Sequence, residues 1–358
     1  MIFHHYISVF FSSLFVSSTL IPIILYICHK RKWYDFTDKR KIHAGDIPRL
    51  GGVGIFWGFL ISSLFILFFV ADKNFAKSNI LKLILIFMSC ILIHIIGLLD
   101  DFKNLRARYK MLGQLFLSII LVELGFSFHE IVIPFTGLII KNVWFCKIVS
   151  VFWIVGISNA MNLIDGIDGL SSVVTFIAAL LFAGINLIHH DYLTCLLSVS
   201  LMGAILGFFI YNKPKGKIFM GDSGSLFIGF LLAILPLINI YPSEQYVLES
   251  SITILIIPIS DTLFAMARRM ITGKKFSCPD KEHLHHILLD LGNTNWEILR
   301  GVGGLTFLFG IFSFDLALSK EYVPASEVTK CHVIWVISFF FIYFLHKTWK
   351  RKNKRGAI

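Results

Sequence analysis

Charged residues are scarce in this chain of 358 residues. Only 15% of its residues are Asp, Glu, Lys or Arg, whereas 56% are hydrophobic and 36 are phenylalanine. Soluble domains are about one-quarter charged, so this composition excludes a chain that buries its apolar residues in one water-soluble core. A mean hydropathy of +0.77 supports the same conclusion, and the sequence predicts an integral membrane protein.

The sequence has no CxxC pair, and we expect no cleavable leader. The six cysteines are scattered without a CxxC pair, which argues against a disulfide framework and against a cysteine metal site. No Lys or Arg precedes the first apolar run, from about Ile7 to Cys28, and Lys30 follows it. This run is too long for the core of a signal peptide, so we expect it to remain as a first membrane span.

Long apolar runs dominate what is present. A helix needs about 20 apolar residues to cross a bilayer, and about eleven runs approach this length. The run at 143–158 fits least well, because it is short and Lys147 interrupts it. The fold class that we predict is an all-α, polytopic membrane helix bundle. The predicted spans are 7–28, 50–70, 80–99, 111–126, 143–158, 172–189, 192–211, 225–240, 249–267, 301–318 and 331–346.

The basic residues predict the orientation of this bundle. If the N-terminus lies outside, 26 of the 33 Lys and Arg residues fall on the inner side, as the positive-inside rule requires. The net charge of +11 then reflects orientation and anionic ligands, and we expect no nucleic acid partner. We expect residues 1–346 to form a single integral membrane domain, and 347–358 to form a basic cytoplasmic tail that attracts anionic lipid headgroups.

The first of four polar clusters on the predicted inner side is Asp100-Asp101, which ends the third run. Either carboxylate could take a proton from an acidic hydroxyl or help to hold a cation. The alternative is a solvated helix end with an ion pair between Asp100 and Lys103, three residues further on.

The second cluster is a polar segment in which oxygen-bearing side chains recur every three residues: Asn159, Asn162, Asp165 and Asp168. On a few helical turns they would form one stripe, and such oxygen ligands suit a hard cation and a nucleoside. A loop stabilised by Asx-turns is the alternative.

The third cluster is the glycine-rich segment 219–225, which includes Phe219 and Asp222. Its backbone N–H groups could bind phosphate at the start of the eighth span. The alternative is that Asp222 serves only as a helix N-cap.

The fourth cluster is His283, His285 and His286 in the longest inner loop. Their spacing does not place three histidines on one helix face, and no cysteine pair completes a site, so zinc is disfavoured. We expect phosphate contacts instead, together with Arg268 and Arg269. Asp261, inside the ninth span, is either a functional acid or a buried partner for a residue such as Arg268.

Taken together and in this order, these clusters resemble the polyprenyl-phosphate N-acetylhexosamine-1-phosphate transferases. The resemblance covers about residues 40–292. The segments that carry it are LDD at 99–101, NAMNLIDGIDGL at 159–170, FMGDSGS at 219–225 and DKEHLHH at 280–286. Arg49-Leu50-Gly51-Gly52 also looks like the first inner loop of that family, and the histidine loop looks like that of its N-acetylglucosamine-1-phosphate branch.

The resemblance implies roles for these residues. Asp222, joined by Asn162, is expected to bind Mg²⁺, with Mn²⁺ as a substitute. Phe219 would stack on uracil, Asp168 would lie near the base, and the Asp100 pair would lie near the lipid phosphate. The family's first-loop lysine has three candidates here, namely Arg40, Lys41 and His43. The full prediction is catalytic Asp100, Asp101, Asp165, His283, His285 and His286; substrate-binding Asn159, Asp168, Phe219, Arg268 and Arg269; and metal-binding Asp222 and Asn162.

The expected reaction moves N-acetylhexosamine 1-phosphate, with N-acetylglucosamine as the first choice of sugar, from a UDP-sugar to undecaprenyl phosphate. It would release UMP and start a cell-envelope glycan, such as a lipopolysaccharide O-antigen or a cell-wall polymer. Either Asp100 or Asp101 would position or deprotonate the lipid phosphate, and a two-step route through an aspartyl-phosphate stays open. The enzyme would lie in the bacterial inner membrane with its site on the cytoplasmic face, among membrane lipids and with a homodimer left open.

Three other functions compete with this one. The same reaction could use another UDP-N-acetylhexosamine or UDP-MurNAc-pentapeptide. A polytopic transporter would place its polar residues near the bilayer midplane, often in repeated halves, whereas here the carboxylates gather on one side and no repeat is found. An inactive lipid-binding scaffold would have lost the carboxylates, and they are present.

Overall fold

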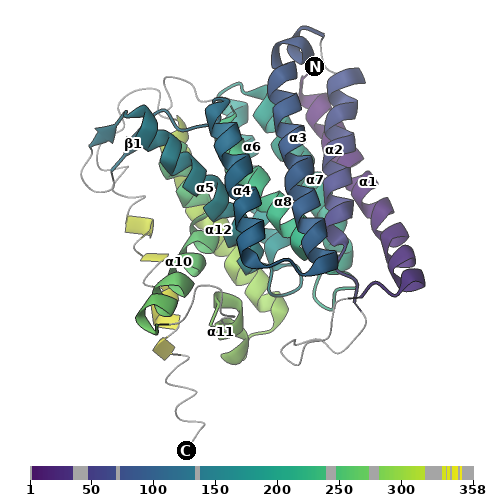
Figure 1. The fold of residues 1–358 in the computed structure, drawn as a ribbon, viewed down its shortest axis with the longest axis vertical. Coiled ribbons are helices and arrows are strands. Elements are labelled where there is room, and N and C mark those ends of the chain that lie inside the picture. Colours follow the sequence, from purple (N-terminus) through teal and green to yellow (C-terminus); the bar gives the residue numbers. More distant parts are fainter. Residues whose placement is uncertain are drawn as a thin grey trace, which may run out of the picture.

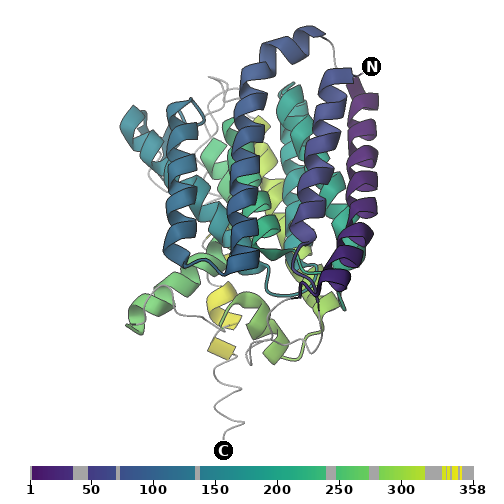
Figure 2. The same ribbon diagram turned by 45° about the vertical axis from the view of Figure 1, so that its right-hand side comes forward.

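The chain folds into a bundle of roughly parallel helices (Figures 1 and 2). The computed structural model describes residues 2–34, 47–69, 73–133, 138–238, 247–273, 282–318, 333–335, 337–338, 341–345 and 347–348. The longer helices are α1 (Ile2–Arg31), α2 (Gly51–Phe69), α3 (Lys73–Lys103), α4 (Ala107–Glu123), α5 (Val143–Ile164), α6 (Leu170–Ile188), α7 (Tyr192–Asn212), α8 (Gly221–Ile234), α10 (Ile256–Ile271) and α12 (Asn295–Leu318).

The shorter elements are η1 (Leu235–Leu237), α9 (Val247–Ile254), α11 (Leu284–Asp290) and a small hairpin of β1 (Ile131–Val132) and β2 (Ile139–Ile140). The two strands are antiparallel, with Ile131 opposite Ile140.

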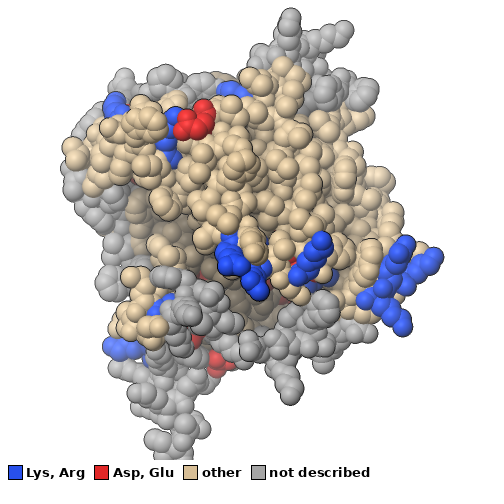
Figure 3. All heavy atoms as spheres, viewed as in Figure 1, with Lys and Arg blue, Asp and Glu red and all other residues tan. Residues whose placement is uncertain are grey.

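Six helices in the described residues are long and apolar enough to cross a membrane, and a seventh span arises if α9 and α10 count as one. This confirms a helical, multi-pass membrane protein. Figure 3 shows a broad surface free of charge, with Lys and Arg gathered mainly along its lower edge. The run at 143–158 lies in the continuous helix α5, whereas the predicted span at 331–346 falls largely outside the described residues. The number of eleven spans stays a prediction.

The predicted run at 249–267 is not one straight helix. The structure divides it into α9 and α10, which meet at Leu255 with a bend of 80°. Pro258 explains the break, because it has no N–H to donate to the carbonyl of Ile254 and is tolerated in the first turn of the next helix. The bend directs α10 out of the bundle at its lower end (Figure 1).

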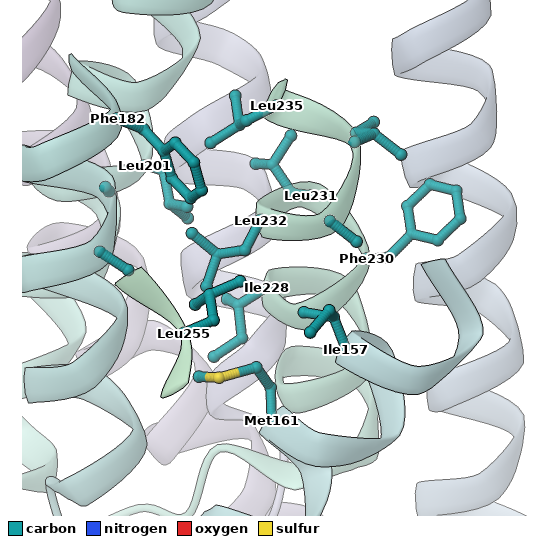
Figure 4. Packing of buried hydrophobic residues seen from close by; sticks show 14 of the residues in the cluster. Ile157, Met161, Phe182, Leu201, Ile228, Phe230, Leu231, Leu232, Leu235 and Leu255 are labelled. Atoms are coloured by element: carbon teal, nitrogen blue, oxygen red, sulfur yellow. The ribbon is translucent and has the colours of Figure 1, made fainter. Parts of the chain in front are cut away.

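Helix α8 is the centre of the bundle. All fourteen of its residues are buried, and it packs against α3, α5 and α2. Figure 4 shows Ile228 and Leu232 of α8 beside Met161 of α5, with Phe182 and Leu201 from α6 and α7 nearby. Apolar neighbours on every side stabilise such a helix. Its polar residues, Asp222, Ser223 and Ser225, lie in its first turns.

The ends of the elements converge at the lower end of the bundle in Figure 1. There α1 ends and α2 begins, α3 leads into α4, α5 ends, and α8 begins. Helices α10 and α11 lie at the same end (Figure 2). The four polar clusters of the sequence are therefore on one side of the protein.

Candidate active site

The loop before α2 and the turn before α8 are joined by backbone hydrogen bonds. The N–H of Phe219 donates to the carbonyl of Pro48 at 2.8 Å, and the N–H of Gly51 donates to the carbonyl of Phe219 at 3.0 Å. A methyl group on Gly52 would overlap the backbone of α8's first turn, so this close approach requires glycine. The pairing brings Arg49 to the start of α8.

Asp222, the second residue of α8, is at the centre of an ionic network. Its Oδ2 accepts from Nζ of Lys110 at 2.7 Å, and its Oδ1 accepts from Nη2 of Arg49 at 3.2 Å. Lys110 also donates to Oδ2 of Asp100 at 3.0 Å. We call Arg49, Asp100, Asp101, Lys110 and Asp222 the Asp222 cluster. Its members come from four segments of the chain, and both Asp100 and Asp222 are buried.

The adjacent residues Asp100 and Asp101 have different surroundings. Asp101 accepts hydrogen bonds from the backbone N–H groups of Asp222 at 2.7 Å and Ser223 at 3.0 Å. It therefore satisfies two of the N–H groups that a helix leaves unpaired at its start, and Asp222 does not act as the N-cap. Asp100 instead pairs with Lys110, and the alternative pair with Lys103 is not what the structure shows.

The polar segment 159–168 does not form one continuous stripe. Helix α5 ends at Ile164, with Asp165 at its C-cap. Gly169 follows in the left-handed region at φ 80°, so the chain turns there before α6 begins. Asn162, still on α5, donates from Nδ2 to Oγ of Ser225 at 2.9 Å, and this bond ties it to α8 one turn beyond Asp222.

Asp165 is beside the Asp222 cluster. Its Oδ1 accepts from Oγ of Ser171 at 2.5 Å. Burial raises the pKa of the Asp165 carboxyl to about 7, and the negative charge of Asp222 acts in the same direction. Asp165 is therefore poised to exchange a proton near neutral pH.

Asn159 and Asp168 flank this centre. Asn159 donates to Oε1 of Gln114 on α4 at 2.6 Å. Asp168 is buried and accepts from the backbone N–H of Gly216 at 3.0 Å, so it fixes the loop that precedes Phe219. Its second oxygen, Oδ1, is buried and has no hydrogen-bond partner among the described residues.

The histidine segment, residues 282–286, is held by Asp261 on α10. The Nδ1–H of His283 donates to Oδ2 of Asp261 at 2.9 Å, and the backbone N–H of Leu284 donates to Oδ1 at 2.8 Å. Of the two alternatives for Asp261, the buried partner is therefore present, but it is His283 and not Arg268.

His285 joins the histidine segment to the polar segment of α5. Its ring is so close to Gly166 that a methyl group there would overlap it. His285 and His286 have ring centroids 4.3 Å apart. Burial lowers the pKa of His285 to about 3, and the neighbouring His286 acts in the same direction, so His285 stays neutral at physiological pH.

Two arginines of α10 lie near the same end. Arg268 has its Nε 3.7 Å from Oε2 of Glu282, and its guanidinium lies over the ring of Phe264 at 5.6 Å. Arg269 is half-buried beside it. Arg268 is therefore next to the histidine segment, through Glu282.

The side chains at this position suit a divalent cation that takes few protein ligands. No group of three or more His, Cys, Asp or Glu side chains within the described ranges could hold a metal alone. Oxygen donors are nevertheless present on Asp222 and on Asn162, whose Oδ1 accepts no hydrogen bond from any described residue. Mg²⁺ commonly takes one or two protein oxygens and completes its shell with water and substrate phosphates, and these donors suit that arrangement.

Sequence reasoning missed Arg49 and Lys110 as site residues. Each lies next to an apolar run, where a basic residue is already explained as an orientation signal. Their partner Asp222 is 173 residues from Arg49 and 112 from Lys110. The three first-loop candidates Arg40, Lys41 and His43 lie outside the described residues.

Comparison with known proteins shows which family the chain resembles. Residues 83–240 match the glycosyl transferase family 4 profile. A Bacillus subtilis (strain 168) protein described as a probable undecaprenyl-phosphate N-acetylglucosaminyl 1-phosphate transferase is 33% identical over 337 residues, which cover 94% of this chain and 88% of the relative.

Two further relatives carry related names. Decaprenyl-phosphate N-acetylglucosaminephosphotransferase of Mycobacterium tuberculosis (strain ATCC 25618 / H37Rv) is 33% identical, with 80% of this chain and 75% of the relative covered. Phospho-N-acetylmuramoyl-pentapeptide-transferase of Lactobacillus johnsonii is 32% identical, with 70% of this chain and 78% of the relative covered.

Proposed function

The chain belongs to the polyprenyl-phosphate hexosamine-1-phosphate transferase family, and we propose that it transfers N-acetylglucosamine 1-phosphate from UDP-N-acetylglucosamine to undecaprenyl phosphate. The product would be the first lipid-linked intermediate of a cell-envelope glycan. The choice of N-acetylglucosamine is supported by the relative that covers 94% of the chain.

The observation that carries this proposal is the Asp222 cluster at the end of the bundle. A lipid phosphate lies at the membrane interface while its chain stays in the bilayer, so groups that act on it must lie where helices end. The cluster has three carboxylates and two basic side chains at such a position, formed by α3, α4, α8 and the loop before α2.

The reaction joins two anions. An oxygen of undecaprenyl phosphate attacks the β-phosphorus of the UDP-sugar, and a new P–O bond forms. The bond from this phosphorus to the bridging oxygen breaks, and the electron pair leaves with UMP. Repulsion between the reactants and charge on the leaving phosphate are the main barriers, so positioning and charge neutralisation supply most of the catalysis.

Lys110 and Arg49 are suited to neutralise this charge. Each binds Asp222 in the structure, and each can exchange a carboxylate oxygen for a phosphate oxygen while remaining charge-paired. Asp100, which shares Lys110, is the better placed of the two adjacent aspartates to position or deprotonate the lipid phosphate, because both oxygens of Asp101 already bind the start of α8.

Asp222 and the Oδ1 of Asn162 would hold Mg²⁺ at this position. The ion would supply positive charge to the diphosphate and so reduce the repulsion between donor and acceptor. Asp165, with its pKa near 7, would accept or return a proton beside the same phosphates.

The nucleoside and sugar would lie on the side of the polar segment and the histidine segment. Phe219 would stack on uracil, and Asp168 and Asn159 would bind the nucleoside. Asp168 supports this assignment through its buried Oδ1, which can still accept a hydrogen bond. His283, His285 and His286, with Arg268 and Arg269, would contact the diphosphate and the sugar.

We also propose that the N-terminus lies outside the cytoplasmic membrane, that about eleven helices span it, and that the site faces the cytoplasm. The excess of basic residues on the predicted inner segments supports this orientation, as does the gathering of those segments at one end of the bundle (Figure 1).

The test is direct. Purified protein in detergent is given undecaprenyl phosphate, Mg²⁺ and one UDP-sugar at a time, and UMP release is measured. We expect UMP with UDP-N-acetylglucosamine, and none without undecaprenyl phosphate or after removal of the metal with EDTA. Release only with UDP-MurNAc-pentapeptide or with another UDP-N-acetylhexosamine would reassign the donor, and a transporter would release no UMP with any donor.

A further inference from the structure

One buried polar group has no role in the reaction described above. His94 lies on α3, seven residues before Asp101, and is buried. Its Nδ1–H donates to the backbone carbonyl of Ser223 at 3.0 Å, which makes a side-chain link from α3 to the first turn of α8. A histidine inside an apolar span is costly to desolvate, so its placement requires an explanation.

His94 belongs to a face of α3 that is fitted to this turn. His94, Gly97 and Asp101 recur at intervals of three and four residues, so they share one side of the helix. A methyl group on Gly97 would overlap the backbone of Asp222 and Ser223. The peptide groups around Ser223 are therefore held at both ends, by Asp101 at the N–H and by His94 at the carbonyl.

The ring of His94 is itself fixed. It stacks on Phe56 of α2, with ring centroids 4.2 Å apart and an angle of 4° between the planes. It also makes an edge-to-face contact with Phe227 of α8, with ring centroids 6.4 Å apart. This packing leaves the Nδ1–H directed at one acceptor. His94 thus joins α2, α3 and α8 about two helical turns from Asp101.

We infer that His94 is a positioning residue for Asp222: its Nδ1–H fixes the Ser223 carbonyl and thereby holds the first turn of α8, and the carboxylate that it carries, in the geometry required for transfer. This inference rests on the proposed function, since it assigns His94 to the same site. A displacement of about 1 Å at a reacting group can cost about 100-fold in rate. Even a small shift of the first turn of α8 should therefore lower kcat measurably.

The chain offers a matched control, a second buried side chain that donates to a backbone carbonyl of α8. Trp153 of α5 donates its Nε1–H to the carbonyl of Ala233 at 2.9 Å, near the other end of α8. Trp153→Phe and His94→Phe each replace a buried N–H donor to α8 by an aromatic ring. His94→Asn is the rescue variant, because its amide nitrogen takes the place of Nδ1 in the histidine ring.

We expect His94→Phe to lower kcat by about tenfold, with a smaller change in KM for the UDP-sugar, and to raise the Mg²⁺ concentration needed for half-maximal activity. His94→Asn should keep kcat within about threefold of the wild type, and Trp153→Phe within about twofold. A wild-type kcat in His94→Phe would overturn the inference. Equal losses in His94→Phe and His94→Asn, or in His94→Phe and Trp153→Phe, would also overturn it.

Amide hydrogen exchange separates this inference from the proposed function. In His94→Phe, peptides that cover residues 219–226 should exchange about tenfold faster than in the wild type, whereas Trp153→Phe should leave them unchanged. This result does not depend on which sugar is transferred. If the wild type releases no UMP, the proposed function fails but faster exchange still supports positioning. Unchanged exchange in His94→Phe would overturn the positioning role.

Discussion

The Asp222 cluster and the histidine segment are built in opposite ways, although they share one end of the bundle. The Asp222 cluster draws charged side chains from four distant segments and joins them by ion pairs at 2.7, 3.0 and 3.2 Å. The histidine segment is five consecutive residues, and a single carboxylate, Asp261, holds two adjacent positions of it. The charges of one region come from four segments of the chain, whereas the other is held mainly by Asp261 of α10, with a close contact from His285 to α5.

This difference suits two tasks. Phosphoryl transfer requires charges whose positions do not change between substrates, and these lie on the packed helices α3, α4 and α8. The histidine segment, which we propose to contact the diphosphate and the sugar, is instead held by local contacts with α10 and α5. The variants below test this contrast.

Asp222→Ala should have the largest effect. It removes the proposed metal ligand and leaves Lys110 and Arg49 without their shared carboxylate, so we expect kcat to fall by about 1,000-fold or more. UMP release at saturating Mg²⁺ measures it, and Asp222→Asn, which keeps the shape but not the charge, is the control. Activity near that of the wild type in Asp222→Ala would refute the assignment.

Lys110→Met should lower kcat/KM by about 100-fold, because it keeps the apolar stem and removes the charge that bridges Asp100 and Asp222. Lys103→Met is the matched control. Lys103 is exposed at the end of α3, so we expect a change of less than about twofold. Equal losses in the two variants would mean that general surface charge, and not the bridge, matters.

Asp261→Asn should lower kcat/KM by about tenfold, because mutation of a residue that supports a functional histidine commonly lowers activity by this factor. This loss is smaller than the losses expected in the Asp222 cluster. The amide can still accept from Leu284, but it is a weaker partner for His283. The measurement is UMP release across several UDP-sugars. A loss as large as that of Asp222→Ala would contradict the contrast between the two regions.

Asp165→Asn should have the smallest of these effects, a change in thermal stability that depends on pH. A carboxyl whose pKa is raised from 3.8 to about 7 disfavours its ionised form in the folded protein, so the wild type loses stability as the pH rises between these values. The amide does not titrate. The variant's Tm relative to the wild type should therefore be a few degrees higher at pH 8 than at pH 4, measured without Mg²⁺ or substrate. A difference that does not change with pH would show that folding does not raise the pKa of Asp165.

The sequence predicted the fold class and most of the clusters because each is a local signal. Apolar runs reveal membrane helices, and the clusters are short segments whose order along the chain is distinctive. The bend between α9 and α10 was visible only as Pro258, and nothing local fixes an angle of 80°. The different surroundings of Asp100 and Asp101 could not be predicted, because the partner that Asp101 caps is more than 120 residues away. For the same reason, the sequence does not predict that Lys110 and Arg49 bind Asp222, although Arg49 lies in the segment that resembles the family's first inner loop.

The complete burial of α8 has a consequence for how the enzyme would respond to its lipid surroundings. A helix of fourteen residues is about 21 Å long, shorter than a hydrocarbon core of about 30 Å, and it has no surface toward lipid. Changes in bilayer thickness are absorbed by tilting of lipid-facing helices, so an outer helix such as α1 would adjust first. Asp222 would keep its place, and the rate of transfer should vary little among membranes of different thickness.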